Sequence, residues 1–255
     1  MRILIFAAAS LIPFAPASAA EDLRVRVGLG AQLRPEYPGA DDTGISPAWK
    51  LSIARGTEPF RFSAPDDHFD IKLVSSGRLT AGPVANIEGG RKKSDLDVPI
   101  GKVSRTVELG AFAQYEVSES IRLRSDVRKG IGGHEGVIAS IGGDRIWRDG
   151  DRYVFSIGPR LLVSDARYQR SWFGVSQAAA MASGLPAYRP GGGVHAVALT
   201  SGMTYQLNPK WGLFGFARYE RLVGDAAKSP IVRQLGSKNQ ASGGIGLTYT
   251  FTVKR

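Results

Sequence analysis

Alternation of apolar and polar residues constrains this chain most. Residues 121 to 128 read Ile-Arg-Leu-Arg-Ser-Asp-Val-Arg, so Ile121, Leu123 and Val127 share one parity. The other parity consists of Arg122, Arg124, Asp126 and Arg128. Successive side chains of a β-strand point to opposite faces of the sheet. One aliphatic face and one charged face are typical of a transmembrane β-barrel with the charged residues facing the lumen, or of a soluble sandwich with the faces exchanged.

The first twenty residues favour the membrane alternative. Met1-Arg2 is a short basic start, residues 3–16 are mostly apolar, and residues 17–20 read Ala-Ser-Ala-Ala. The apolar stretch is shorter than the roughly 20 residues that span a bilayer as a helix. The pattern predicts a secretory signal peptide over 1–20, cut after Ala19 or Ala20, followed by one barrel domain over 21–255.

The amino-acid composition excludes several classes of functional site. The chain has no cysteine and 32 glycines, and its formal charge is +10. Disulfides, thiolate metal sites and a cysteine nucleophile are therefore excluded. The basic residues are dispersed, with no run longer than Arg91-Lys92-Lys93, so we expect no nucleic-acid partner for this exported chain. Basic residues at a barrel mouth can instead meet lipopolysaccharide phosphates or attract anionic solutes.

Strand-like segments follow one another almost to the C-terminus. We predict an all-β, antiparallel transmembrane barrel of about twelve strands, with ten as the nearest alternative, because bacterial barrels have even strand numbers. The candidate strands are 23–32, 46–55, 59–64, 67–74, 79–90, 104–117, 121–130, 136–147, 151–164, 194–207, 211–222 and 240–251. Short turns would then face the periplasm, and the long connections 33–45, 91–103, 165–193 and 223–239 would face the exterior.

The long connections carry the candidate loop residues. Residues 176–182, Ser-Gln-Ala-Ala-Ala-Met-Ala, predict a short helix on or in the barrel mouth. The exterior-loop motif consists of Tyr37, Pro38, Gly39, His134, Gly184, Pro186, Ser229 and Pro230. These residues either form ordinary stiff turns or fold inward together and plug the mouth.

The sequence gives little support for a catalytic site or a metal site. The three histidines, His68, His134 and His195, show no metal-ligand spacing, so we expect no metal and no cofactor. Asp41 and Asp42 could meet His134 and Glu135 in an acidic cluster of the kind outer-membrane proteases use. The simpler reading of His134 is a turn residue that hydrogen-bonds neighbouring backbone.

Longer segments resemble the MipA/OmpV family of Gram-negative outer-membrane proteins. They are RPEYPGADD at 34–42, GRLTAGPVANIEGGRKKSD at 77–95, ELGAFAQYEV at 108–117, RLRSDVRKGIGGHEG at 122–136, GPRLLVSDARYQRSWFGVS at 158–176, SGLPAYRPGGGV at 183–194 and RLVGDAAKSPIVRQLGSKNQASGGIGLTYTF at 221–251. The segments occur in family order over essentially the whole chain after residue 20. One departure is that Phe251 is followed by four further residues, whereas such barrels usually end on an aromatic residue.

The resemblance implies an outer-membrane barrel without an established catalytic residue set. One family member is described as a scaffold that links a murein lytic transglycosylase to a bifunctional murein synthase, and others as osmoregulated or adhesive surface proteins. We therefore expect a non-enzymatic scaffold with periplasmic murein enzymes as partners. The alternatives are a surface adhesin, a hydrolase, or a small anion-preferring pore in which Lys50, Arg160 and Arg218 add positive charge against Glu108 and Glu220.

Overall fold

The computed structural model describes residues 21–96 and 98–254. The proposed signal peptide lies outside the described residues. Ten long strands form most of the wall: β1 (Leu23–Pro35), β2 (Thr43–Arg55), β5 (Leu79–Glu88), β6 (Thr106–Ser118), β7 (Ile121–Gly132), β8 (Val137–Asp149), β9 (Tyr153–Ser164), β10 (Gly193–Gln206), β11 (Trp211–Leu222) and β12 (Asn239–Val253). Two short strands complete it, β3 (Phe69–Asp70) and β4 (Val74–Ser76).

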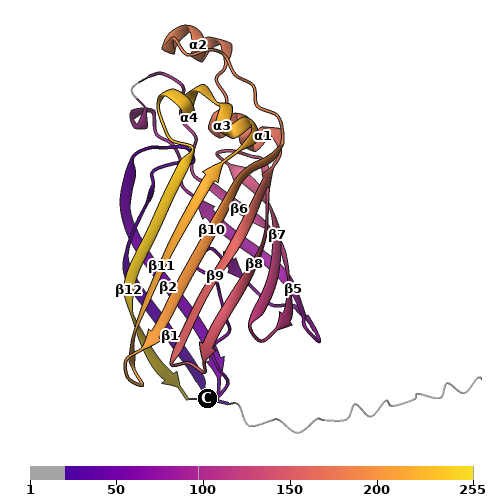
Figure 1. Ribbon diagram of the computed structural model, residues 1–255, viewed down its shortest axis with the longest axis vertical. Helices are drawn as coiled ribbons and strands as arrows, with labels where there is room; N and C mark the ends of the chain where they lie inside the picture. The colour runs from indigo at the N-terminus through magenta and orange to yellow at the C-terminus, as the bar shows by residue number, and fades with distance from the viewer. Residues whose placement is uncertain (1–20, 97, 255) are drawn as a thin grey trace, which may run out of the picture.

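The strands form one curled antiparallel sheet. Its order is β2-β1-β12-β11-β10-β9-β8-β7-β6-β5-β3, with β4 also paired to β5. The first strand pairs with the last, since Val27 of β1 lies opposite Tyr249 of β12. Figure 1 shows long tilted strands around one axis, with the helices at one end and the end of β12 at the other. The predicted all-β antiparallel barrel of about twelve strands is confirmed.

The predicted strands between residues 59 and 74 differ from those in the structure. Residues 59–64 are not a strand, and residues 67–74 contribute only β3 and the start of β4. Pro59 and Pro65 cannot donate to a ladder, and Asp66 and Asp67 would place carboxylates in the wall. Residues 56–68 therefore leave the sheet at the periplasmic end of β2 and enter the barrel. We call them the inner segment.

Strand parity runs consistently around the wall. Ile121, Leu123 and Val127 of β7 are exposed on the outer face. The alternate residues of β7, Arg122, Arg124, Asp126 and Arg128, are buried. Further exposed apolar residues on the outer face include Leu29, Ile45, Ile87, Leu109, Ile141, Leu199, Ile245 and Leu247. Such an apolar belt is the lipid-facing surface of a transmembrane barrel.

Short helices occupy the exterior loops. They are η1 (Lys93–Asp95), α1 (Ala166–Phe173), α2 (Gln177–Ser183), α3 (Gly224–Lys228) and α4 (Pro230–Gln234). The helix predicted at 176–182 corresponds to α2, where Ser176 caps the first turn by accepting from the backbone N of Ala179 at 3.1 Å. The other helices were not predicted. Within the described ranges, none of the helices is long and apolar enough to cross a membrane.

Candidate functional site: the barrel lumen

An apolar cluster covers the exterior mouth, and we call it the exterior cap. It consists of Tyr37, Ala40, Leu96, Val103, Ile138, Tyr168, Trp172, Phe173, Val175, Ala179, Leu185, Ala196, Leu222, Ala226, Ile231 and Val232. In Figure 1, α1, α3 and α4 lie together over the strand ends, while α2 projects above them. Each of the four long exterior connections contributes residues, so the loops fold together over the mouth.

Residues 37–39 are held in place at this cap. The Gly39 backbone N donates to Gln240 Oε1 at 3.1 Å, and Gly39 has φ +95°, a conformation that suits glycine. The Arg91 guanidinium lies 5.5 Å from the centre of the Tyr37 ring. Burial raises the pKa of Tyr37 to about 12, although the Arg91 charge opposes the shift. Pro38 is half-buried beside them.

The remaining loop-motif residues shape two helices. Gly184 ends α2 with φ +75°, and Pro186 is exposed beyond it. Ser229 precedes α4, where its hydroxyl accepts from Ile231 N at 3.2 Å and donates to the Phe173 carbonyl at 2.7 Å. Pro230 occupies the first turn of α4. Ser229 thereby joins the 223–239 loop to α1.

His134 is a buried turn residue. The Gly136 backbone N donates to its Nδ1 at 3.0 Å, so Nε2 carries the proton and donates to Glu108 Oε1 at 3.0 Å. Both ring nitrogens are therefore occupied. Among the described residues, no contact joins His134 to Asp41 or Asp42, and the acidic cluster considered from the sequence does not form.

The inner segment is tied to the lumen wall through Asp66. Its carboxylate forms two contacts of 2.9 Å with Arg160 of β9, one to Nε and one to Nη2. Arg218 of β11 lies 2.6 Å from the same carboxylate, and the Thr200 hydroxyl donates to it at 3.1 Å. One carboxylate therefore joins the inner segment to three consecutive strands, β9, β10 and β11.

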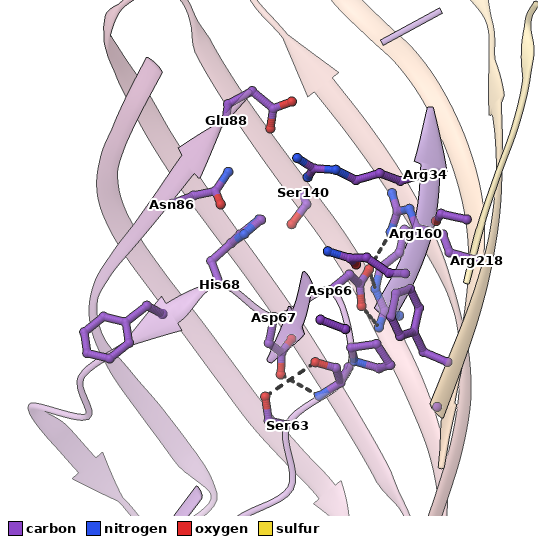
Figure 2. A pocket seen from close by; sticks show the side chains of 18 of the residues that line it. Arg34, Ser63, Asp66, Asp67, His68, Asn86, Glu88, Ser140, Arg160 and Arg218 are labelled. Carbon is purple, nitrogen blue, oxygen red and sulfur yellow. Dashed lines mark hydrogen bonds and ion pairs between the residues drawn. The ribbon is translucent and has the colours of Figure 1, made fainter. Parts of the chain in front are cut away.

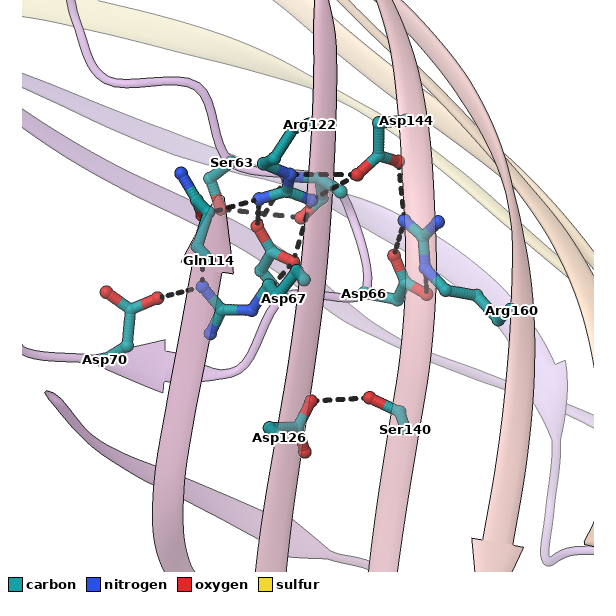
Figure 3. Close-up of polar contacts among 12 residues, drawn as sticks. Ser63, Asp66, Asp67, Asp70, Gln114, Arg122, Asp126, Ser140, Asp144 and Arg160 are labelled. Atoms are coloured by element: carbon teal, nitrogen blue, oxygen red, sulfur yellow. Dashed lines mark hydrogen bonds and ion pairs between the residues drawn. The ribbon is translucent and has the colours of Figure 1, made fainter. Parts of the chain in front are cut away.

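Asp67 makes a second anchor on strand β7. Arg122 of β7 contacts its two oxygens at 2.5 and 3.1 Å, and Arg124 lies 3.5 Å away. Asp144 of β8 links the two anchors, since it accepts from Arg122 Nε at 2.9 Å and from Arg160 Nη2 at 2.7 Å. Figure 3 shows this chain of alternating charges across β7, β8 and β9. Charge-assisted bonds of this kind are among the stronger polar contacts in proteins.

Ring and backbone contacts complete the attachment. The Arg26 guanidinium lies 4.1 Å from the centre of the Phe60 ring, and that of Arg122 lies 4.6 Å from the Phe62 ring. At the periplasmic end, Arg148 Nη2 donates to the Phe60 carbonyl at 2.6 Å. Pro65 packs over Gly202, where an added Cβ would lie only 2.4 Å from Pro65 Cγ.

The residues predicted to face the lumen are thus brought together, and their partners come both from the inner segment and from neighbouring strands. Arg122 and Arg124 meet Asp67, and Arg124 also meets Asp70 at 2.9 Å. Asp126 accepts from the Ser140 hydroxyl at 2.5 Å and lies 3.1 Å from Arg128. Sequence analysis missed the role of Asp66 and Asp67. Two adjacent carboxylates directly after a proline were the available signal against a strand.

Above the inner segment lies a cavity of about 1190 Å³. Figure 2 shows Arg34, His68, Asn86, Glu88, Ser140 and Arg218 around it, with Asp66 and Arg160 paired at its base. Lys50 of β2 lines the same cavity. Opposite charges are mixed on these walls, because the strands supply both arginines and Glu88, and the inner segment adds Asp66 and Asp67.

A protein-family model, described as MltA-interacting protein MipA, matches residues 27–251. The chain belongs to the MipA family. With the apolar belt described above, the protein is an outer-membrane β-barrel of this family. Among curated proteins no match is found.

Solved structures with a similar arrangement are outer-membrane channels. The COG4313 outer membrane channel from Pseudomonas putida F1 has a TM-score of 0.44 and 10% identity, covering 96% of this chain and 100% of that chain. The anion-selective porin from Comamonas acidovorans has a TM-score of 0.40 and 9% identity, covering 90% and 98%. The NanC porin has a TM-score of 0.40 and 8% identity, covering 89% and 98%.

Proposed function

We propose that this protein is a non-enzymatic interaction protein of the outer membrane, a scaffold that binds murein enzymes at its periplasmic end. The observation that carries the proposal is the filled lumen. The inner segment is held by Arg122, Arg160 and Arg218, and the exterior cap covers the mouth. A barrel whose lumen is occupied by its own chain is poorly suited to conducting solutes. Its outer surfaces and turns remain available to bind partners.

Removing one partner of a buried ion pair costs about 3–5 kcal/mol, because the other charge stays buried. Asp66 is shared by Arg160 and Arg218, and Asp67 by Arg122 and Arg124, so displacing the inner segment would break ion pairs at four lumen arginines at once. Those arginines would keep only the wall carboxylates Asp144, Asp70 and Glu220. This favours a segment that stays in place. His134, whose ring nitrogens are both engaged, offers no free base for a hydrolase.

The periplasmic turns supply the contact surface for a murein enzyme. Arg152 and Asp149 are exposed at the β8–β9 turn, and Lys210 is exposed at the β10–β11 turn. The family name records an interaction with MltA, and we extend that interaction to this chain. At the opposite end, exposed Lys92 and Lys93 are placed to meet lipopolysaccharide phosphates.

Purified barrel in detergent, titrated with a purified MltA-type lytic transglycosylase, tests the scaffold. We expect saturable binding that weakens by about tenfold when Arg152 and Lys210 are both changed to Glu, since rim charges contribute about 1 kcal/mol or more together. The matched control changes Lys92 and Lys93 to Glu at the exterior end and should bind normally. Absence of binding, or equal loss in the control, contradicts the proposal.

A small pore is the second candidate, and the lumen cavity favours it. The cavity is large enough for small solutes, and Arg34 and Lys50 line it. Planar-bilayer recordings separate the candidates. A silent bilayer supports the filled scaffold, whereas persistent anion-selective channels in the unmodified protein support the pore.

A further inference from the structure

The wall has two free edges, on β2 and on β5. Within residues 21–96 and 98–254, no ladder joins β2 to β3, β4 or β5. On its free side, β5 receives β3 and β4 only from Leu79 to Ala85. Beyond that point, residues 86–88 pair with β6 alone. We call the gap between β2 and β5 the seam.

The lumen cavity reaches the seam. Along a strand, inward-pointing residues alternate with outward-pointing residues. The cavity contacts six consecutive residues of β2, Ala48, Trp49, Lys50, Leu51, Ser52 and Ile53, so three outward-pointing side chains of this free edge border it. It also contacts outward Ile87 and inward Glu88 of β5. The cavity therefore borders outward-pointing residues of both edges at the one place where the described strands leave the wall unpaired, and the seam is its route to the outer surface.

The outer side of this opening is apolar. Trp49, Leu51 and Ile53 line it on β2, with exposed fractions of 69%, 49% and 54%. Phe69 and Ile87 line it on the other edge, and both are more than half exposed. These residues belong to the lipid-facing belt, so the neighbouring solvent is the acyl region of the bilayer.

The inner side of the opening holds cations that are not engaged by the network. Among the described residues, Lys50 and Arg34 make no hydrogen bond or ion pair, whereas Arg160 and Arg218 are each paired with Asp66. Figure 2 shows Arg34 directed into the cavity. Its guanidinium comes within 3.8 Å of the position that a Cβ on Gly89 would take, close to the free edge of β5.

We propose that the seam admits an anionic single-chain amphiphile from the bilayer into this cavity. The carboxylate or phosphate headgroup binds Lys50, and the acyl chain lies along the neighbouring Trp49 and Leu51 and along Ile87 on the opposite edge. Each buried methylene contributes about 0.8 kcal/mol, and a charge-assisted contact holds the headgroup. The cavity exceeds the roughly 300–1,000 Å³ of common ligand pockets, so a chain with its headgroup fits.

The test uses the full barrel in nonionic detergent. The probe is palmitate that carries a photoactivatable diazirine in its acyl chain, and the methyl ester of this probe is the neutral comparison. After irradiation, mass spectrometry locates the adducts. We expect palmitate adducts to concentrate on β2, on β5 and on the inner segment, and the ester to label the whole apolar belt. Even labelling around the belt by both probes overturns the proposal, and this comparison needs no variant.

Variants of Lys50 test whether its charge binds the headgroup. Lys50→Met should lower palmitate adducts at the seam by about tenfold, the equivalent of one charge-assisted contact. Lys50→Arg should retain them, and Lys210→Met in a periplasmic turn is the matched control. Unchanged seam labelling in Lys50→Met overturns the proposal. Binding of the lytic transglycosylase is measured on the same preparations, so failure of the scaffold and failure of the lipid site are separate results.

Discussion

Arg160 of β9 and Asp66 of the inner segment form a two-point ion pair, with both nitrogen–oxygen distances at 2.9 Å. The pair joins the barrel wall to a stretch of chain that the wall itself surrounds. Arg160 also reaches Asp144 at 2.7 Å, which in turn contacts Arg122, the partner of Asp67. The strength of this network determines whether the lumen stays filled.

Neutralising the two carboxylates should open the barrel. In Asp66→Asn/Asp67→Asn, the lumen arginines lose their shared partners and the inner segment loses both anchors. We expect persistent, anion-selective conductance in planar bilayers, because the arginines that remain attract anions. Asp149→Asn, which removes an exposed contact to Arg152, is the control and should stay silent. Cation-selective channels would contradict the charge argument.

Strand parity can be tested with a pair of exchanges on β7. Leu123 is 49% exposed toward lipid, and an arginine there near the midplane costs about 2–4 kcal/mol. Arg124→Leu leaves Asp67 with Arg122 and Asp70 with Arg61. Leu123→Arg should therefore reduce the heat-modifiable folded band more than Arg124→Leu does. The opposite order would indicate a sheet packed as in a soluble sandwich.

A single methyl group can probe the packing of the inner segment. Gly202→Ala places a Cβ about 2.4 Å from Pro65 Cγ, so Pro65 must move. Overpacking of this kind typically costs about 1–3 kcal/mol. We expect a lower unfolding temperature on heated gels and faster protease cleavage within residues 56–68. Gly215→Ala is the control, because its nearest neighbour is the Gly244 carbonyl oxygen at 3.4 Å.

Ser229 is expected to stabilise the exterior cap. Ser229→Ala removes the 2.7 Å bond to the Phe173 carbonyl and the cap of α4, a loss of about 1–2 kcal/mol. Limited proteolysis of intact cells should then cut the 223–239 loop faster. Ser176→Ala removes only the cap of the projecting α2, so cleavage should rise near residue 177 and not in the 223–239 loop. Equal cleavage patterns would argue against a role for Ser229 in joining the loops.

Local alternation determined the wall of this protein. Which face of β7 carries Arg122 and which carries Leu123 follows from a two-residue period, and that period depends only on neighbouring residues. The long exterior loops could be placed because they separate alternating segments. The short helix α2 could be placed because its helix-forming residues are neighbours in the sequence. The chain's membership of its family was also apparent from the order of its segments.

Only the tertiary structure decided where residues 56–68 go. As an isolated string, residues 59–74 alternate well enough for two wall strands, but Asp66 and Asp67 are stabilised by arginines that lie 94 residues and 55 residues away along the chain. No local pattern encodes those distances. The seam has the same origin. Once the inner segment leaves the wall, β2 and β5 are not paired with each other, because a sheet edge depends on where another part of the chain has folded.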